Sequence, residues 1–304
     1  MRRRIAALVG TGLMAAGLSI AGPQQSQIPA DYQEVLTYLG RTGDFKSGVL
    51  KVNVPRNDLR VAVHGVAVPT AFGFGGWVAM TKGEGGQDVM MGDLVLLQDE
   101  VNPVMSSLLD NDLEVTALHN HFFWEEPRLF YMHIHGMGKA ADLARRVKPG
   151  LDLIGGLSGK PQAPGPLISP APSGGLTSSE LARIVGRPGE TLGAVYKITV
   201  GREDIDLRAM GAVIGPRMGL NSWAAFFGSD DHAVIAGDIA MLENEVTPVL
   251  KALRANGLDV VALHHHMTGI RPVIIFLHYW GEGPAAKLAA GFRAALDVSA
   301  GKPK

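Results

Sequence analysis

The chain is an internal duplication. Residues 92–152 align with residues 237–297 without a gap, and 25 of the 61 paired positions are identical. Upstream of this segment the offset grows by one residue and pairs Gly65 with Gly211 and Trp77 with Trp223. A repeat of domain size differs from the short repeats that build solenoids. The sequence therefore predicts two homologous halves, either sharing one core or packing as pseudo-twofold neighbours.

The predicted boundaries follow from composition. The first repeat is expected over 28–152 and the second over 177–298, separated by a linker over 153–176. The linker is rich in Gly, Pro and Ser, which bury too little apolar surface to order a segment. We therefore expect two folded repeats joined by a connection without a core of its own.

The N-terminus has the pattern of an export signal. Residues 1–21 begin with three arginines, continue through a short apolar stretch and end on small residues, as in a cleaved secretory signal peptide. A single anchoring helix is the alternative, but the apolar stretch is short for a full membrane span. The sequence predicts a periplasmic or secreted protein without stable membrane insertion after cleavage.

Charge and cysteine content exclude several classes of protein. The 28 Lys and Arg residues balance 29 Asp and Glu residues, whereas nucleic-acid-binding proteins normally carry a basic surplus. Cysteine is absent, so disulfides, thiolate metal sites, thiol nucleophiles and a lipidated N-terminal cysteine are excluded.

Each repeat has the same predicted order of elements, which is typical of an α+β fold. A helix opens each repeat, at 31–39 and 178–185. Asn102-Pro103 and Thr247-Pro248 predict a later helix in each repeat, because a cap residue followed by Pro is a common helix start. A His-bearing antiparallel hairpin is expected between that helix and a last one. The strands are predicted at 48–54, 59–68, 75–81, 113–122 and 128–135 in the first repeat, and at 194–200, 205–214 and 222–227 in the second.

Three histidine positions are shared by the two copies. His119, His121 and His133 pair with His264, His266 and His278. Residues two apart on a strand point to the same face, and the hairpin brings the third histidine opposite the first. Three converging imidazoles are a common ligand set for transition metals. The sequence thus predicts one metal cluster per repeat, with zinc as the first choice and copper or iron as alternatives.

Carboxylates could complete these clusters. Glu100 and its counterpart Glu245 could act as a fourth ligand, as a partner of a ligand histidine, or as general base to a metal-bound water. Glu125 is a weaker catalytic candidate, and Asp93 with Asp238 a weaker ligand pair. His135 would join the first cluster, but Trp280 replaces it in the second copy.

Three functions remain open from the residues, and whether the protein is an enzyme is undecided. The main prediction is an exported soluble protein that binds a transition metal through one histidine cluster per repeat. The first alternative is a metal-dependent hydrolase with its active site in the first repeat. The second is a duplicated envelope binding or scaffold domain with structural histidines. The expected partners are a metal ion and a small-molecule substrate, and the oligomeric state is open.

The segments GDLVLLQDEVNPVMSSLLDNDLEVTALHNHFFWEEPRLFYMHIHG and GLDVVALHHHMTGIRPVIIFLHYWG resemble the LppY/LpqO family of exported bacterial proteins. The resemblance covers both halves of the chain and implies export and a duplicated domain of unknown function. Some members are lipid-anchored, which the lack of cysteine excludes here.

Overall fold

The computed structural model describes residues 27–155 and 175–299. The predicted signal peptide and most of the predicted linker lie outside the described residues. The domain boundaries given above therefore stay predictions.

The first repeat forms one six-stranded antiparallel sheet with strand order β1-β2-β5-β6-β9-β7. A small three-stranded sheet, β4-β3-β8, lies beside it. The strands are β1 (Gly43–Lys46), β2 (Val49–Pro55), β3 (Val61–Val63), β4 (Val66–Val68), β5 (Gly75–Lys82), β6 (Asp88–Leu97), β7 (Glu114–His119), β8 (Glu125–Glu126) and β9 (Leu129–Gly138). The helices are α1 (Ala30–Leu39), α2 (Val101–Asp110) and α3 (Ala140–Leu153), with short 3-10 turns η1 (Thr70–Phe72) and η2 (Glu84–Gly86).

The second repeat has the same topology, with strand order β10-β11-β14-β15-β17-β16. Its strands are β10 (Glu190–Leu192), β11 (Val195–Gly201), β12 (Arg208–Ala209), β13 (Ala212–Val213), β14 (Asn221–Gly228), β15 (Ala233–Leu242), β16 (Asp259–His264) and β17 (Ile274–Gly283). Its helices are α4 (Ser178–Val185), α5 (Val246–Ala255) and α6 (Ala285–Ser299), with 3-10 turns η3 (Pro216–Met218) and η4 (Glu243–Glu245). The predicted α+β class with two similar halves is confirmed.

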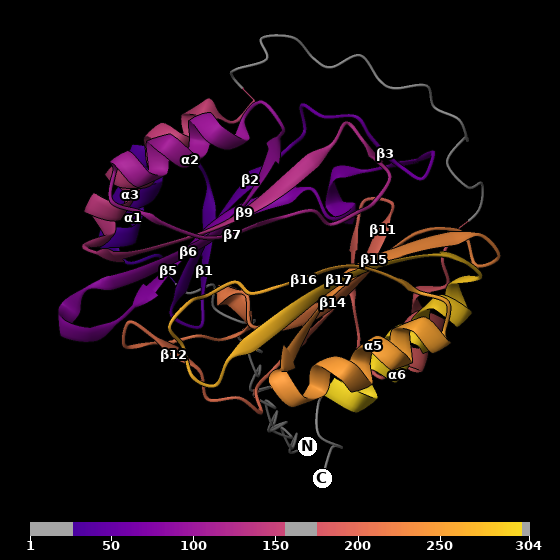
Figure 1. Ribbon diagram of the computed structural model, residues 1–304. Helices are drawn as coiled ribbons and strands as arrows, with labels where there is room; N and C mark the ends of the chain where they lie inside the picture. Colours follow the sequence, from indigo (N-terminus) through magenta and orange to yellow (C-terminus); the bar gives the residue numbers. More distant parts are fainter. Residues whose placement is uncertain (1–26, 156–174, 300–304) are drawn as a thin grey trace, which may run out of the picture.

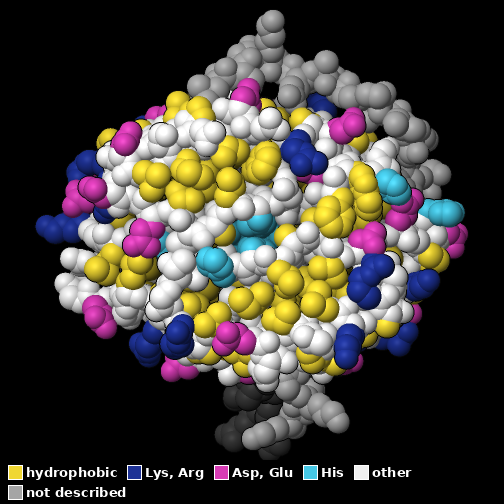
Figure 2. All heavy atoms as spheres, viewed as in Figure 1, with side chains coloured by type: hydrophobic (Ala, Val, Ile, Leu, Met, Phe, Trp, Pro, Cys, Tyr) yellow, Lys and Arg dark blue, Asp and Glu magenta, His cyan; other side chains and the backbone are white. Residues whose placement is uncertain are grey.

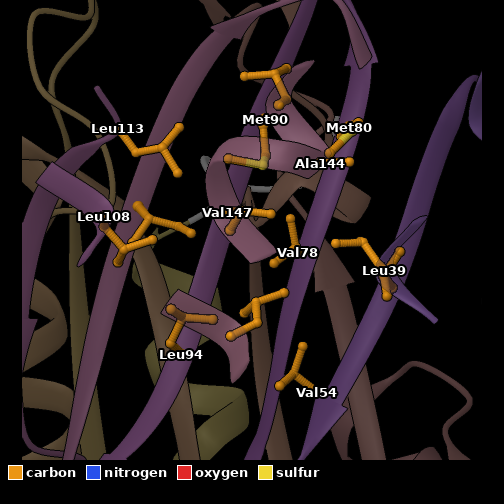
Figure 3. Close-up of a cluster of buried hydrophobic side chains, with 14 of the residues drawn as sticks. Leu39, Val54, Val78, Met80, Met90, Leu94, Leu108, Leu113, Ala144 and Val147 are labelled. Atoms are coloured by element: carbon orange, nitrogen blue, oxygen red, sulfur yellow. The ribbon is translucent and has the colours of Figure 1, made fainter. Parts of the chain in front are cut away.

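Each sheet is covered by helices on one face only. In the first repeat, α1, α2 and α3 bury leucine, valine and methionine side chains against the sheet (Figure 3), among them Leu39, Val78, Leu94, Leu108 and Val147. Burial of apolar area of this kind is the main favourable term in folding. A matching core lies beneath α4, α5 and α6.

The other faces of the two sheets pack against each other. Figure 1 shows the two sheets between the two outer groups of helices, so the molecule has four layers. Two buried apolar clusters combine residues of both repeats: Val95 and Phe122 share one with Phe227 and Trp280, and Met91 shares the other with residues of the second repeat. The two repeats therefore share a core between their sheets in addition to the core that each forms beneath its helices.

The sequence prediction missed the short strands β1, β8 and β10, and it missed one long strand in each repeat, β6 and β15, which lie inside the sheets. Both read as nearly continuous apolar runs, VMMGDLVLL and AVIAGDIAML, rather than as an alternating pattern. A strand covered on both faces loses the alternation that marks a half-exposed strand. The covering layers are the helices on one side and the other repeat on the other.

Candidate functional site between the two repeats

A row of polar and aromatic side chains crosses each sheet. In the first sheet the strand register aligns Asn53, Trp77, Asp93 and His133 on β2, β5, β6 and β9. Residues in register on neighbouring strands project to the same face. The second sheet repeats the row with Thr199, Trp223, Asp238 and His278.

These rows face the space between the sheets. On β6, Met90 and Leu94 belong to the core beneath the helices, whereas Met91 and Val95 belong to the shared clusters. Because successive side chains alternate between faces, Asp93 projects with Met91 and Val95 toward the other repeat. The duplication thus places two equivalent polar rows opposite each other.

The six shared histidines form a single cluster at one end of these rows. The rings of His119 and His264 stack with a centroid distance of 3.8 Å. His133 stacks on His266 at 3.9 Å, and their counterparts His278 and His121 lie 3.5 Å apart. Every one of these close ring pairs joins one repeat to the other. The prediction of one separate cluster per repeat is wrong, because the facing sheets bring both triads into the same interior space.

The histidines that converge most closely also come from both repeats. One nitrogen from each of His119, His264 and His278 lies within 4.8 Å of the others. A second group of this kind consists of His133, His264 and His266. Neither group contains a carboxylate among the residues that the structure describes, and no group is built from one repeat alone.

The hydrogen bonds within the cluster use only part of its capacity. The Nε2 atoms of His133 and His119 lie 3.0 Å apart, and those of His266 and His264 lie 3.2 Å apart. His278 Nδ1 lies 3.1 Å from the carbonyl oxygen of Gly237. Buried nitrogens without a hydrogen-bond partner are His278 Nε2, His264 Nδ1 and both ring nitrogens of His121.

Burial keeps these imidazoles neutral. Removal from water lowers the pKa of His119 to about 4 and holds the pKa of the other five rings well below the usual range. Desolvation penalises the charged form, and neighbouring imidazoles oppose a second proton. A neutral imidazole has one free lone pair, which is the form that binds a metal ion.

The cluster lies near one edge of the two sheets and beside an inner cavity. Figure 2 shows histidine side chains between two hydrophobic areas at the centre of one face, where Figure 1 places the edge strands β7 and β16. On the inner side, His121, His266 and His278 line a cavity of about 490 Å³. The cluster therefore lies between this cavity and the edge at which the two sheets meet.

The cavity is lined by equivalent residues of both repeats. Its walls include Lys51 and Lys197, Trp77 and Trp223, Asp93 and Asp238, Gly73 and Gly219, and His121 and His266. The tryptophans pack reciprocally across the interface. A Cβ on Gly219 would lie 3.5 Å from the Trp77 ring, and a Cβ on Gly73 would lie 3.6 Å from the Trp223 ring. Both glycines have positive φ, a conformation that other residues adopt at a cost.

The charged lining holds three cationic side chains, Lys51, Lys197 and Arg217, beside three carboxyls, Asp93, Asp238 and Glu190. The ammonium groups of Lys51 and Lys197 each lie 4.4 Å from the centroid of a tryptophan ring, Trp77 and Trp223 respectively. Burial first, and then the neighbouring cations Lys197 and Arg217, lower the pKa of Lys51 to about 8, against the raising effect of Asp93 and Asp44. Arg217 donates to Asp44 at 2.8 Å across the two repeats, while its buried Nε has no partner.

The two central aspartates are buried in the same wall. Desolvation raises the pKa of Asp93 to about 7 and the pKa of Asp238 well above its usual value. Asp93 Oδ1 has no hydrogen-bond partner, and Asp238 Oδ2 lies 3.5 Å from His266 Nε2. At neutral pH these carboxyls carry less negative charge than exposed aspartates would.

The structure does not bring Glu100 to the histidines. Glu100 accepts from Arg56 Nη1 at 2.6 Å and from the backbone N–H groups of Leu97 and Gly155 at 2.8 and 2.7 Å. In the second repeat, Glu245 accepts from Arg202 Nη1 and from the Leu242 N–H, both at 2.8 Å. Both glutamates are buried partners of an arginine at the start of α2 and α5. These contacts occupy both carboxylates, so neither glutamate is available as a metal ligand or as a general base.

Glu125 and His135 also lie apart from the convergent groups. Glu125 is buried on β8, where its side chain accepts from the Leu129 N–H at 3.4 Å, and burial raises its pKa. His135 is buried on β9 opposite Met91, and removal from water lowers its pKa to about 4. Neither residue lines the cavity.

Sequence reasoning missed the cationic part of the cavity. Lys51 and Lys197 occupy equivalent positions in the duplication, so the same comparison that selected the histidines could have selected them. A lysine in an alternating strand is usually assigned to the solvent face, and only the facing repeat turns this face inward.

Comparison with known families identifies the chain. The model of the family described as Domain of Unknown Function (DUF1259) matches residues 33–153 and 179–298. The chain belongs to this family and contains two copies of its domain. No curated protein matches the chain.

Two solved structures match the chain only loosely. The trimeric bacterial microcompartment shell protein PduB is 13% identical, with 85% of this chain and 90% of that chain covered and a TM-score of 0.21. EtuB from Clostridium kluyveri is 10% identical, with coverages of 87% and 97% and a TM-score of 0.20. Superpositions this loose assign no role to the chain.

Two predictions are corrected at this point. The main predicted function, an exported metal-binding protein with a cluster in each repeat, is not retained, because both convergent histidine groups combine residues of the two repeats. The periplasmic or secreted location is not retained either, and its signal peptide lies outside the described residues. Within the described residues, no helix has the length and apolar character needed to cross a membrane.

Proposed function

We propose that this member of the family, with its two domain copies, is a binding protein for a small organic anion and that the cavity between the repeats is its ligand site. One observation carries the proposal. Lys51 and Lys197, which occupy equivalent positions in the two repeats, line the same cavity, and both repeats build this cavity symmetrically. This reading develops the binding-domain alternative from the sequence. The finer assignment to the LppY/LpqO family stays a prediction.

The lining offers an anion three cationic side chains as hydrogen-bond donors. Three cationic side chains, Lys51, Lys197 and Arg217, face the cavity with Glu190 and the two buried aspartates. Burial raises the pKa of Asp93 to about 7, so this carboxyl offsets the cations only in part. A bound carboxylate or phosphate would give the lysines and the Arg217 Nε an acceptor, and charge-assisted hydrogen bonds of this kind are strong.

The size and the walls of the cavity favour an organic ligand. A volume of about 490 Å³ falls within the range of small-molecule sites, which combine apolar walls with a few polar groups. Trp77 and Trp223 supply flat apolar surface on both sides. The lysines above these rings are held by cation–π contacts and are thus positioned before a ligand arrives.

The hydrolase alternative receives no support from the position of its proposed base. Glu100 is occupied by Arg56 and two backbone N–H groups, and Glu125 does not line the cavity. A general base must lie within hydrogen-bond reach of the proton that it removes. We therefore propose binding rather than hydrolysis.

The test is titration calorimetry with citrate as a probe anion, compared with phosphate and with uncharged glycerol. We expect citrate to bind the wild-type protein and glycerol not to bind. A Lys51→Met/Lys197→Met variant should lose at least about tenfold in citrate affinity, because two charge-assisted contacts disappear.

The matched control is Lys148→Met, which removes an exposed lysine that pairs with Asp152 on the outer helix α3. This variant should bind citrate like the wild type. Equal citrate binding by the double variant, or no binding of either anion by the wild-type protein, would contradict the proposal.

A further inference from the structure

We infer that the histidine cluster holds one divalent transition-metal ion on His119, His264 and His278, a centre that neither repeat can build alone. This centre differs from the separate clusters excluded above, because its ligands cross the interface between the repeats. Its ligands include none of the three cationic side chains of the proposed anion site, although His278 also lines that cavity.

The first argument is convergence. One ring nitrogen from each of these three histidines lies within 4.8 Å of the others. Nitrogens that share one metal ion at about 2.0–2.1 Å lie within roughly 4 Å of one another. The three side chains come from β7, β16 and β17, whose positions are fixed by strand pairing. Strand pairing therefore holds the backbone of the three ligands in place, and the stacked rings rotate about their side-chain torsions to direct their lone pairs at one ion.

The second argument is unmet bonding capacity. His264 Nδ1 and His278 Nε2 are buried without a hydrogen-bond partner. A buried polar atom without a partner costs free energy, and most such atoms in folded proteins are satisfied. Histidines that served only to pack would be expected to exchange hydrogen bonds with carbonyl groups or carboxylates. A metal ion would instead satisfy several of these nitrogens at once.

The third argument is the second bond made by one of the ligands. His278 places its Nδ1 3.1 Å from the Gly237 carbonyl oxygen, which leaves Nε2 directed into the cluster. A metal-binding histidine typically donates its other ring N–H to a carbonyl or a carboxylate, and this contact fixes the tautomer. His278 makes this contact through Nδ1 while its Nε2 has no partner. This combination is typical of a metal ligand rather than of a packing residue.

The cluster favours one ion rather than two. His264 belongs to both convergent groups, and its equivalent His119 stacks directly on it. The two groups therefore compete for the same ring. Three imidazoles leave a fourth position of a tetrahedral ion open, and the cavity reaches the cluster through His278.

The experiment measures metal binding by the full chain, expressed without a polyhistidine tag and dialysed against a chelator. Titration with ZnCl₂ should give one equivalent per chain. Co²⁺ should produce the intense visible absorption of a tetrahedral centre, which adventitious surface binding does not produce. His264→Ala should weaken Zn²⁺ binding more than about 100-fold, beyond the loss typical for changes outside the ligand set.

Two controls keep the result specific. His135→Ala removes a buried histidine outside the convergent groups, and His232→Ala removes an exposed one; both should keep one equivalent. If His264→Ala does not fold by circular dichroism, His119→Gln replaces it with the same expectation. The Lys51→Met/Lys197→Met variant should lose citrate binding and keep Zn²⁺, which separates this inference from the proposed function.

Three results would overturn the inference. They are no Zn²⁺ or Co²⁺ binding by the wild-type chain, unchanged binding by a folded His264→Ala variant, and two equivalents that variants in separate repeats remove independently.

Discussion

The imidazole rings of His119 and His264, which occupy equivalent positions in the two repeats, stack on each other at 3.8 Å. The other close contacts occur in pairs around this one, His133 with His266 and His278 with His121. This pairing is the signature of a pseudo-twofold axis that passes between the sheets. The duplication therefore builds one interior site from two half-sites, rather than two sites.

Removing the carboxylate of Glu100 should destabilise the fold without affecting the interior site. Arg56 is 1% exposed and Glu100 is fully buried, so Glu100→Gln removes the buried one of the two carboxylates that pair with the guanidinium and leaves only Asp58. A buried charge left without any partner costs about 3–5 kcal/mol, and the retained Asp58 makes this range the upper bound for the variant. Urea denaturation should show this loss in the free energy of unfolding.

The same variant separates a structural role from a ligand role. Under native conditions Glu100→Gln should bind Zn²⁺ and citrate as the wild type does. Asp142→Asn, which removes an exposed partner of Arg145, is the matched control and should change stability by less than about 1 kcal/mol. If folded Glu100→Gln lost Zn²⁺ binding, Glu100 would be a metal ligand, and this prediction would be contradicted.

Citrate affinity should fall as the pH rises above about 8. The pKa of Lys51 in the empty cavity is about 8, lowered first by desolvation and then by Lys197 and Arg217, against the opposing effect of Asp93 and Asp44. An anion binds the protonated form, so affinity is full below this pKa and decreases above it. The decrease is at most about tenfold per pH unit for one linked proton.

Calorimetry at about pH 7 and pH 9.5 measures this dependence. The Lys51→Met variant supplies the control, because its weaker binding should depend less on pH over the same interval. An affinity that rises with pH in the wild type would contradict the assignment of Lys51 to the anion site.

The two repeats should depend on each other for solubility. Each sheet presents its inner face to the other repeat, and the shared clusters include Phe122, Phe227, Met91 and Phe276. Exposed apolar patches of this kind lead to association or aggregation. Coexpressed fragments 27–155 and 175–299 should copurify as a one-to-one complex, whereas either fragment alone should aggregate or self-associate.

Size-exclusion chromatography with light scattering distinguishes these cases. Two fragments that remain monomeric and soluble when separate would show that the shared core contributes little to the fold.

Truncation of a residue beneath the outer helices should destabilise the first repeat. Leu108 is fully buried and packs closely against Gly150 on the neighbouring helix α3. Leu108→Ala removes apolar contacts and leaves a cavity, which costs about 2–5 kcal/mol. Leu109→Ala is the control, because Leu109 is 52% exposed and should have little effect. Thermal denaturation of both variants measures the difference.

The sequence predicted the repeats and most of their elements, since the duplication and the helix signals are local. The helix at 178–185 matches α4, and the helix at 31–39 begins one residue later than α1. β6 and β15 escaped prediction because their apolar runs reflect burial on both faces. That burial depends on a tertiary contact between repeats that no local pattern contains.

The histidines were found from the sequence, but their grouping was not. The spacing of His119, His121 and His133 indicates one strand pair within one repeat, and it says nothing of a second sheet facing the first. The lysines illustrate the same gap. In a single repeat, the sheet face that carries Lys51 would be exposed to solvent. This face becomes the wall of a cavity only when the second repeat covers it.

The most direct test of the shared interior site is a crystal of the Zn²⁺-loaded protein, measured on both sides of the zinc absorption edge. We predict one anomalous peak per chain, surrounded by His119 of the first repeat and His264 and His278 of the second. Two peaks, each surrounded by histidines of a single repeat, or a peak only on the outer surface, would contradict the account.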